Sequence, residues 1–268
     1  MIGASGFIGS SLTTKLRAEG NTVFAPVRGD ADIFTSSLGH VIYAAGITAD
    51  FRSRPFDTLR ANTNFVAQLL EQANFESLLY LSSARIYRHA EHSGEDAAIF
   101  LRSSDPEDLY DLTKLTGEAL CHASGRNFVR VVRLTNVVGS DFRSQNFLFD
   151  LIRVACDTGE IKLRSRLESA KDYVLLQDVL EILPKVAIKG NCACYNLGSG
   201  RNLTHAELLE PILTNTGARL TIEPNAPQIV TQQINIDRIC KEFGYQPSPV
   251  LPFIPELIHE YQKSQQRL

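Results

Sequence analysis

The stretch Met1-Ile2-Gly3-Ala4-Ser5-Gly6-Phe7-Ile8-Gly9 opens the chain and decides its fold class. Its spacing, Gly-x-x-Gly-x-x-Gly, places bare backbone at a tight turn, and an apolar pattern of helical period follows over residues 7–19. Glycines let a phosphate approach the backbone, and the start of the helix directs free N–H groups and a partial positive charge toward it. The stretch therefore predicts a phosphate-binding loop, with a simple turn as the alternative.

A loop of this kind normally leaves a β-strand, yet only Met1 and Ile2 precede Gly3. We expect Met1 to be an internal or misassigned start, with upstream in-frame codons for about four to six mostly apolar residues, the ordinary length of a strand.

Short apolar runs alternate with helical patterns through the first half of the chain. Strands are predicted over residues 22–27, 40–45, 78–82 and 129–134, and helices over residues 7–19, 56–73 and 106–123. Alternation of this kind is typical of an α/β fold with a doubly wound, Rossmann-like parallel sheet. Residues 1–139 are therefore predicted to form a dinucleotide-binding domain.

Residues 140–268 are predicted to form a smaller, mostly helical substrate-binding lobe. The predicted helices cover residues 146–157, 177–187, 205–216, 236–243 and 254–265, and short strands lie near 194–197 and 220–222. Residues 177–200 are expected to return to the sheet. Ligands of such folds bind at the carboxyl ends of the strands, and the lobe is expected there.

Composition limits the partners of this chain. The formal net charge of -3 gives no reason to expect nucleic acid, and no apolar run approaches the length of a membrane span. The five cysteines are an odd, scattered set, which predicts reduced thiols and a cytoplasmic location. Cys192 and Cys194 lack a second Cys or His pair at ligand spacing, so no metal site is predicted.

The second predicted strand carries a signal for the cofactor. In dinucleotide folds an acid after this strand binds a ribose 2′-hydroxyl, whereas an arginine accommodates a 2′-phosphate. Val27 stands at the expected acid position and Arg28 follows it. Arg28 therefore favours NADP, and Asp30 or Asp32 would serve NAD.

Tyr110 and Lys114 form a Tyr-x-x-x-Lys pair, four residues apart on a predicted helix, so both side chains lie on one face. A tyrosine can act as a base at neutral pH only if its pKa is lowered. A nearby ammonium lowers that pKa because it stabilises the phenolate. Ser83 ends the strand predicted over residues 78–82, where its hydroxyl is placed to bond a substrate oxygen. The pair alone is a short motif that also occurs by chance.

These features occur together with further motifs in a fixed order. The motifs are Gly3 to Gly9, Tyr43-Ala44-Ala45-Gly46, Asn62, Ser82 to Tyr87, Tyr110 to Lys114, Arg133 to Gly139, Lys171 to Val174, Gln177 to Val179, Tyr195 to Gly200, Asn235 to Asp237 and Phe243 to Pro247. Together they resemble the extended short-chain dehydrogenase/reductases of the NAD(P)-dependent epimerase/dehydratase family, which mostly modify nucleotide sugars. The resemblance spans nearly the whole chain.

The resemblance implies a Ser-Tyr-Lys site for hydride transfer. Tyr110 would be the general acid/base, Lys114 would lower its pKa and hold the nicotinamide ribose, and Ser83 would orient the substrate oxygen. Cofactor contacts are expected from Gly3, Ser5, Gly6, Phe7, Ile8, Gly9, Arg28, Ala44, Ala45, Gly46, Asn62, Tyr110 and Lys114. Substrate contacts are expected from Arg85, Asn136, Asn146 and Lys171.

Departures from the family pattern bear on the reaction. Sugar 4,6-dehydratases of the family place an acidic pair after the strand-ending Ser or Thr, where this chain has Ala84 and Arg85, so a dehydratase is disfavoured. We expect an NAD(P)-dependent epimerase or oxidoreductase acting on a nucleotide-linked sugar. The alternatives are an NADPH-dependent carbonyl reductase and a non-catalytic dinucleotide-binding sensor. The resemblance also implies a homodimer that pairs through the helices predicted over residues 56–73 and 106–123.

Overall fold

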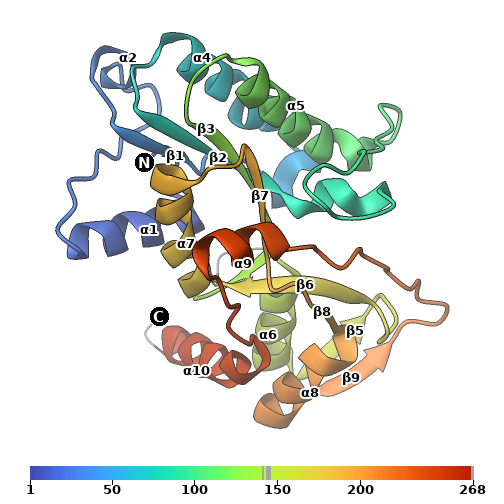
Figure 1. Ribbon diagram of the computed structural model, residues 1–268. Helices are drawn as coiled ribbons and strands as arrows, with labels where there is room; N and C mark the ends of the chain where they lie inside the picture. The colour runs from blue at the N-terminus through green and yellow to red at the C-terminus, as the bar shows by residue number, and fades with distance from the viewer. Residues whose placement is uncertain (141, 143–145, 267–268) are drawn as a thin grey trace.

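The computed structural model describes residues 1–140, 142 and 146–266, and a parallel sheet forms the centre of this structure. Within those residues the sheet has four strands in the order β1-β2-β3-β7, and each neighbouring pair is parallel (Figure 1). The strands are β1 (His40–Tyr43), β2 (Ser77–Ser83), β3 (Val129–Leu134) and β7 (Cys194–Leu197). The predicted α/β class with a parallel sheet is confirmed.

Side chains of each strand alternate between two hydrophobic cores, because successive residues of a strand point to opposite faces. Leu78 and Tyr80 of β2 pack with α4 (Phe65–Gln72) and α5 (Leu109–Ala123). Leu79 and Leu81 pack on the other face. The helices of that face are α1 (Phe7–Ala18), α7 (Leu176–Lys189) and α9 (Asp237–Phe243). Strands buried on both faces explain the nearly continuous apolar runs in the sequence.

The strand predicted over residues 22–27 is wrong. Ile2 lies beside β1, with a single parallel bridge to Tyr43, and the Met1 ammonium donates to the Phe24 carbonyl oxygen at 2.6 Å. The Arg17 Nη2 of α1 also donates to the Val23 carbonyl oxygen at 3.0 Å, and residues 22–27 form no strand pairing in the described structure. Apolar composition alone does not make a strand without a partner for its backbone groups. A single helical turn, α2 (Asp32–Thr35), follows.

The helix predicted over residues 56–73 is interrupted by a π-helical turn. It consists of α3 (Pro55–Leu59), the turn η2 (Arg60–Asn64) and α4. Two buried tyrosines of the sheet hold the turn: Tyr43 donates its hydroxyl to the Ala61 carbonyl oxygen, and Tyr80 donates to that of Asn62 at 2.7 Å. These contacts fix Asn62 against α5.

The second part of the chain has its own core (Figure 1). It is built from α6 (Phe147–Thr158), α8 (His205–Thr216) and α10 (Ile254–Gln265). Two small sheets cross it, one with β4 (Asn136–Val138), β6 (Ala170–Leu175) and β8 (Asn202–Thr204), the other with β5 (Glu160–Leu163) and β9 (Arg219–Ile222). Sequence patterns missed all of these strands except β9, because three to six residues give little periodicity.

Short 3-10 turns complete the structure: η1 (Ala49–Arg52), η3 (Ala84–His89), η4 (Pro106–Asp108) and η5 (Leu251–Phe253). None of the helices in the described residues is long and apolar enough to cross a membrane.

Candidate active site

The glycine loop turns tightly against the sheet and against the start of α1. Gly3 has φ +85°, and a Cβ there would lie 2.5 Å from the Ala45 backbone nitrogen. A Cβ on Gly9 would lie 2.1 Å from the Gly3 carbonyl oxygen. The Gly6 N–H donates to that same oxygen at 3.0 Å, and α1 begins directly after Gly6. Gly3 and Gly9 therefore admit no larger side chain, and the start of α1 faces the space in front of the loop.

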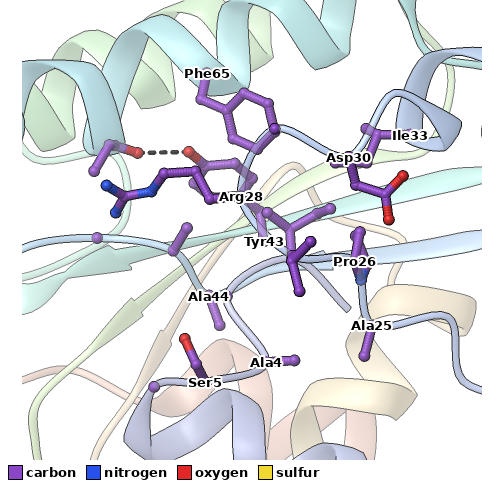
Figure 2. A pocket seen from close by; sticks show the side chains of 18 of the residues that line it. Ala4, Ser5, Ala25, Pro26, Arg28, Asp30, Ile33, Tyr43, Ala44 and Phe65 are labelled. Carbon is purple, nitrogen blue, oxygen red and sulfur yellow. Dashed lines mark hydrogen bonds between the residues drawn. The ribbon is translucent and has the colours of Figure 1, made fainter.

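A cavity of about 1230 Å³ lies over this loop (Figure 2). Its lining joins the glycine loop to residues 25–31 and to the residues that follow β1. Of the predicted cofactor residues, the lining includes Gly3, Ser5, Gly6, Arg28, Ala44, Ala45 and Gly46. Arg28 is exposed at its rim, and among the described residues no hydrogen bond or ion pair holds its guanidinium.

Phe7, Ile8 and Gly9 are not among the described lining residues. Phe7 packs edge-on against Phe149 of α6, with ring centroids 6.5 Å apart, and Ile8 packs against the sheet core. Gly9 is buried against the backbone of the loop. These residues shape the loop from behind.

The opposite wall of the cavity was not predicted from the sequence. Asp57, Arg60, Phe65 and Gln68 line it from the helix that contains the π-helical turn. Arg60 is ion-paired with Asp57 at 3.0 Å. Figure 2 shows the Phe65 ring on this side of the cavity, across from Ser5 of the loop. A helical pattern alone does not show which face of a helix borders a cavity.

Tyr110, Lys114 and Ser83 converge beside the inner end of this cavity. Tyr110 is hydrogen-bonded to the Ser83 side chain, and the Lys114 ammonium donates to the Leu81 carbonyl oxygen at 2.9 Å. A Cβ on Gly46 would lie 3.1 Å from the Lys114 Nζ, so a residue of the cavity wall contacts the lysine directly. Tyr110 and Lys114 are almost fully buried, and Ser83 is partly buried.

Asn62 lies on the same side of Lys114 as Gly46. A Cβ on Gly46 would lie 2.9 Å from the Asn62 Oδ1, which is buried and has no hydrogen-bond donor among the described residues. The Asn62 Nδ2 donates to the Thr113 hydroxyl at 3.0 Å. The free acceptor therefore faces the junction of the cavity and the Tyr-Lys pair.

Burial controls the titration of this group. Burial raises the pKa of Tyr110 to about 12. The hydrogen bond with Ser83 and the charge of Arg85 act in the opposite direction and lower it. Burial lowers the pKa of Lys114 to about 8, opposed by the charge of Glu118. Tyr110 is therefore protonated at neutral pH in this structure, and Lys114 carries its charge there.

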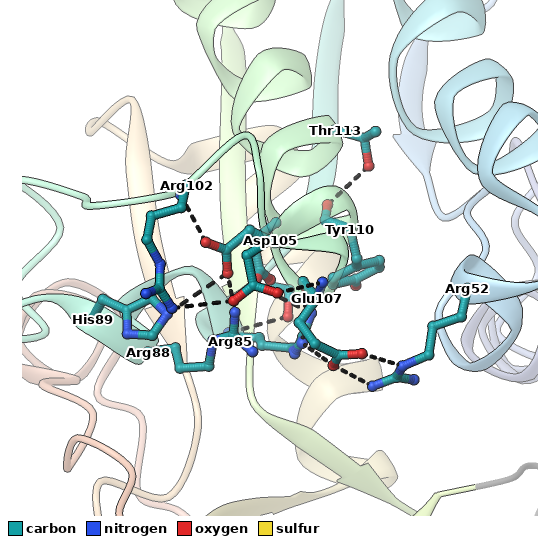
Figure 3. A network of polar contacts seen from close by, with 12 residues as sticks. Arg52, Arg85, Arg88, His89, Arg102, Asp105, Glu107, Tyr110 and Thr113 are labelled. Atoms are coloured by element: carbon teal, nitrogen blue, oxygen red, sulfur yellow. Dashed lines mark hydrogen bonds and ion pairs between the residues drawn. The ribbon is translucent and has the colours of Figure 1, made fainter.

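Arginines and carboxylates surround the outer edge of Tyr110 (Figure 3). The Arg85 Nη1 lies 3.1 Å from Asp111, and its Nη2 donates to the Glu107 carbonyl oxygen at 3.1 Å. Arg52 is ion-paired with both oxygens of the Glu107 carboxylate. Burial raises the pKa of Asp111 to about 6, opposed by the charges of Arg85 and Arg88. No sequence motif marks Glu107 or Asp111 as part of this site, although Asp111 directly follows Tyr110.

Comparison with known proteins identifies the family. The model of the NAD dependent epimerase/dehydratase family matches residues 1–198 of the chain. The chain belongs to this family.

Solved structures of this epimerase/dehydratase type have the same fold. MoeE5 in complex with UDP-glucose and NAD matches with a TM-score of 0.82 and 24% identity over 98% of both chains. TunA, an NAD-dependent NDP-hexosamine 5,6-dehydratase, matches with a TM-score of 0.84 and 19% identity over 98% of this chain and 96% of its own. The UDP-glucuronic acid 4-epimerase from Bacillus cereus matches with a TM-score of 0.78 and 18% identity over 98% of both. No curated protein sequence matches the chain.

The structure fits the cofactor of the epimerase/dehydratase family at the glycine loop. Gly3 and Gly9 keep the loop tight, since a Cβ on either would clash with neighbouring backbone atoms, and the cavity in front of the loop is large enough for a dinucleotide. The unpaired acceptor of Asn62 and the ammonium of Lys114 lie at its inner end.

The residues predicted to contact substrate lie in different surroundings. Asn136 is exposed, and its Nδ2 donates to the Asp172 carbonyl oxygen at 2.7 Å. Asn146 caps α6, accepting from the Phe149 N–H at 3.0 Å. The Lys171 Nζ lies 5.2 Å from the Phe147 ring centroid, and no carboxylate of the described residues pairs with it. Burial, and then the charge of Arg85, lower the pKa of Lys171.

Proposed function

We propose that the chain is an NAD(P)-dependent epimerase or oxidoreductase that acts on a nucleotide-linked sugar. The observation that carries this proposal is the contact between the glycine-cradled cavity and the Ser83, Tyr110 and Lys114 group at Gly46. A nucleotide in the cavity would place its far end beside the tyrosine. MoeE5, which has this fold, is complexed with UDP-glucose and NAD.

In this proposal the region up to residue 139 binds the cofactor and residues 140–268 bind the sugar nucleotide. Gly3, Ser5, Gly6, Ala44 and Ala45 would hold the cofactor from the loop side. Asn136 and Lys171 would face the substrate phosphates, with Asn146 at the start of the adjoining helix. Lys171 suits this role because its ammonium is largely buried and has no acidic partner among the described residues.

The chain's own residues would move a proton. NAD(P), when bound, would supply the acceptor and donor for hydride transfer to and from a sugar carbon. Ser83 would hold the sugar hydroxyl. Tyr110 would act as its phenolate, once the positive charges of Lys114 and of a bound oxidised nicotinamide lower its pKa, and would take the hydroxyl proton as the carbonyl forms and give it back on reduction. The Lys114 ammonium, charged at neutral pH, would stabilise the phenolate. We propose an epimerase or reductase over a 4,6-dehydratase because Ala84 and Arg85 replace the acidic pair.

Cofactor binding tests the proposal. Calorimetric titration of the purified chain with NAD, NADP and their reduced forms should give binding by at least one of them. Failure of all four to bind would exclude the epimerase, the carbonyl reductase and the dinucleotide sensor alike. With a cofactor bound, turnover without net absorbance change supports an epimerase, whereas stoichiometric NADPH oxidation supports the reductase.

Arg28 sets the expected choice between the two cofactors. Its unpaired guanidinium at the cavity rim suits a 2′-phosphate, so Arg28→Ala should weaken NADP binding by about 10- to 100-fold, as the loss of one charge-assisted hydrogen bond requires. NAD affinity should stay nearly the same. Equal effects on both dissociation constants would rule out a role for Arg28 in cofactor choice.

We also propose that two copies pair through α3, α4 and α5. Phe56 and Leu59 of α3 are 73% and 41% exposed, which is unusual for large apolar side chains so close together on one helix. Light scattering should give twice the chain mass, and Phe56→Glu should halve it. A monomer at micromolar concentration would contradict this assignment.

A further inference from the structure

The segment of residues 47–54, between β1 and α3, covers the outer face of Tyr110. The ring of Phe51 in this segment is only 4% exposed and lies 5.7 Å from the Tyr110 ring, centroid to centroid. Buried Phe51 contrasts with exposed Arg52, Ser53 and Arg54, which follow it. The apolar ring therefore separates the tyrosine from solvent.

One ion pair joins this segment to the start of α5. The Arg52 Nε and Nη2 both contact the Glu107 carboxylate, one to each oxygen (Figure 3). The Arg52 guanidinium carbon lies 4.4 Å from the Phe51 ring centroid, and that of Arg85 lies 5.2 Å from it. The Phe51 ring is thus held between two guanidinium groups and the Tyr110 ring. A planar guanidinium bound to both carboxylate oxygens fixes orientation as well as distance.

The closed segment conflicts with access to Tyr110. The described lining of the cavity includes Ile47 but not Tyr110, Ser83 or Lys114. A sugar that exchanges a proton with Tyr110 has to approach within hydrogen-bond distance of a hydroxyl that is now buried. The Arg52–Glu107 pair, whose side chains are 57% and 40% exposed, is weak enough to break.

We propose that residues 47–54 are a cover over Tyr110, with Phe51 as its inner contact and the Arg52–Glu107 ion pair as its latch. Opening of the latch admits the reacting end of the ligand, and closure excludes water from the tyrosine. This inference rests on the proposed function only in taking Tyr110 as the acid/base.

Hydrogen exchange of the free protein tests the latch. The Ser53 and Arg54 amides both donate to the Asp50 carbonyl oxygen, at 3.1 and 2.9 Å, so their exchange reports opening of the segment. Glu107→Gln leaves residues 47–54 unchanged in sequence and should accelerate both amides by about 1.5- to 5-fold, the factor that loss of an exposed ion pair allows. Arg52→Gln, corrected for its intrinsic rate, should do the same, and the double variant should add nothing further.

Glu19→Gln is the matched control. It removes an exposed carboxylate that pairs with Lys15 of α1 and has no bond to Glu107 or to residues 47–54 in the described structure. Exchange of the Ser53 and Arg54 amides in this variant should equal that of the unmodified chain. Unchanged exchange in both latch variants, or equal acceleration in Glu19→Gln, would overturn the latch.

A ligand experiment tests the gating role separately. ADP should occupy the cavity without reaching Tyr110 and leave the Ser53 and Arg54 amides unchanged. NAD should accelerate them, because its nicotinamide end displaces the cover; NAD that binds in calorimetry without changing their exchange would overturn gating. Absence of binding by NAD, NADP and both reduced forms would overturn the proposed function instead, while the latch variants still decide whether the cover exists.

Discussion

Tyr110 is placed to exchange a proton with a bound sugar through its contact with Ser83. Tyr110→Phe removes only the hydroxyl, so turnover should fall by about 10²- to 10⁴-fold, the usual contribution of a positioned acid/base. The dissociation constant of NAD should change little. Tyr261→Phe is the control, because that hydroxyl bonds Asp157 in the second core, and its turnover should stay unchanged. Full activity of Tyr110→Phe would refute the assigned base.

Lys114 should make stability depend on pH in the alkaline range. Burial lowers its pKa to about 8, below the value near 10.4 of an unfolded chain, so the unfolded state binds the extra proton between these values. The cost of the buried charge is fully present below about pH 8 and disappears as the pH rises toward about 10.4. The unfolding free energy of the unmodified chain, relative to Lys114→Met, should rise by about 3 kcal/mol over this range. Urea unfolding at pH 7 and pH 10 would measure it, and an unchanged difference would contradict the buried ammonium.

At the scale of elements, α5 is held close to the π-helical turn by a glycine. A Cβ on Gly117 would lie 2.4 Å from the Tyr80 hydroxyl and 2.8 Å from the Asn62 carbonyl oxygen. These are the groups whose hydrogen bond fixes the turn. The small residue lets Tyr110 and Lys114 of α5 approach Asn62 and Gly46, so packing of two helices sets the geometry of the site.

Gly117→Ala should destabilise the fold, although alanine favours a helix by about 1 kcal/mol. Overpacking against Tyr80 should give a net loss of about 1–3 kcal/mol in the unfolding free energy. Thr116→Ala, one residue away at an exposed position, is the control and should stay within about 0.5 kcal/mol. Tyr80→Phe should recover part of the loss in the double variant. A Gly117→Ala protein as stable as the control would show that the contact relaxes freely.

Across the whole molecule, one buried ion pair connects separate parts of the chain. Glu118 of α5 pairs with Arg133 of β3 at 2.7 Å, and the two side chains are 2% and 6% exposed. Arg133 also donates to the Tyr87 hydroxyl, which donates to Asn196 of β7 at 2.9 Å. The network thus connects three parts of the chain: α5, the turn after β2, and strand β7, which comes from the second half of the chain.

Removal of one member should leave a buried charge without its partner. Glu118→Leu should lower the unfolding free energy by about 3–5 kcal/mol in urea titrations. The double variant Glu118→Leu/Arg133→Met replaces the pair with apolar side chains and should regain most of that loss. Additive losses in the double variant would mean that the two residues act separately.

Local patterns determined most elements of the fold. The glycine spacing, the alternating apolar runs and the tyrosine-lysine spacing depend on short-range geometry, which is why β3, α8 and α10 have the predicted bounds. The family follows from the same ordered motifs, and the match over residues 1–198 confirms it. The prediction of a strand over residues 22–27 failed because a strand needs a neighbouring strand to pair with, which composition does not reveal.

Only the tertiary structure decided what surrounds the predicted residues. The glycine loop, Gly46 and Lys114 are far apart in sequence, and parallel strand packing brings them together. Phe51, Arg52 and Glu107 carry no motif, because a cover and its ion pair depend on distances between segments rather than on spacing along the chain. The sequence alone determined which side chains carry the proposed chemistry. Long-range packing decided that Tyr110 is buried, that Lys114 has a lowered pKa and that the Phe51 ring packs against Tyr110, since burial and contact depend on the whole fold.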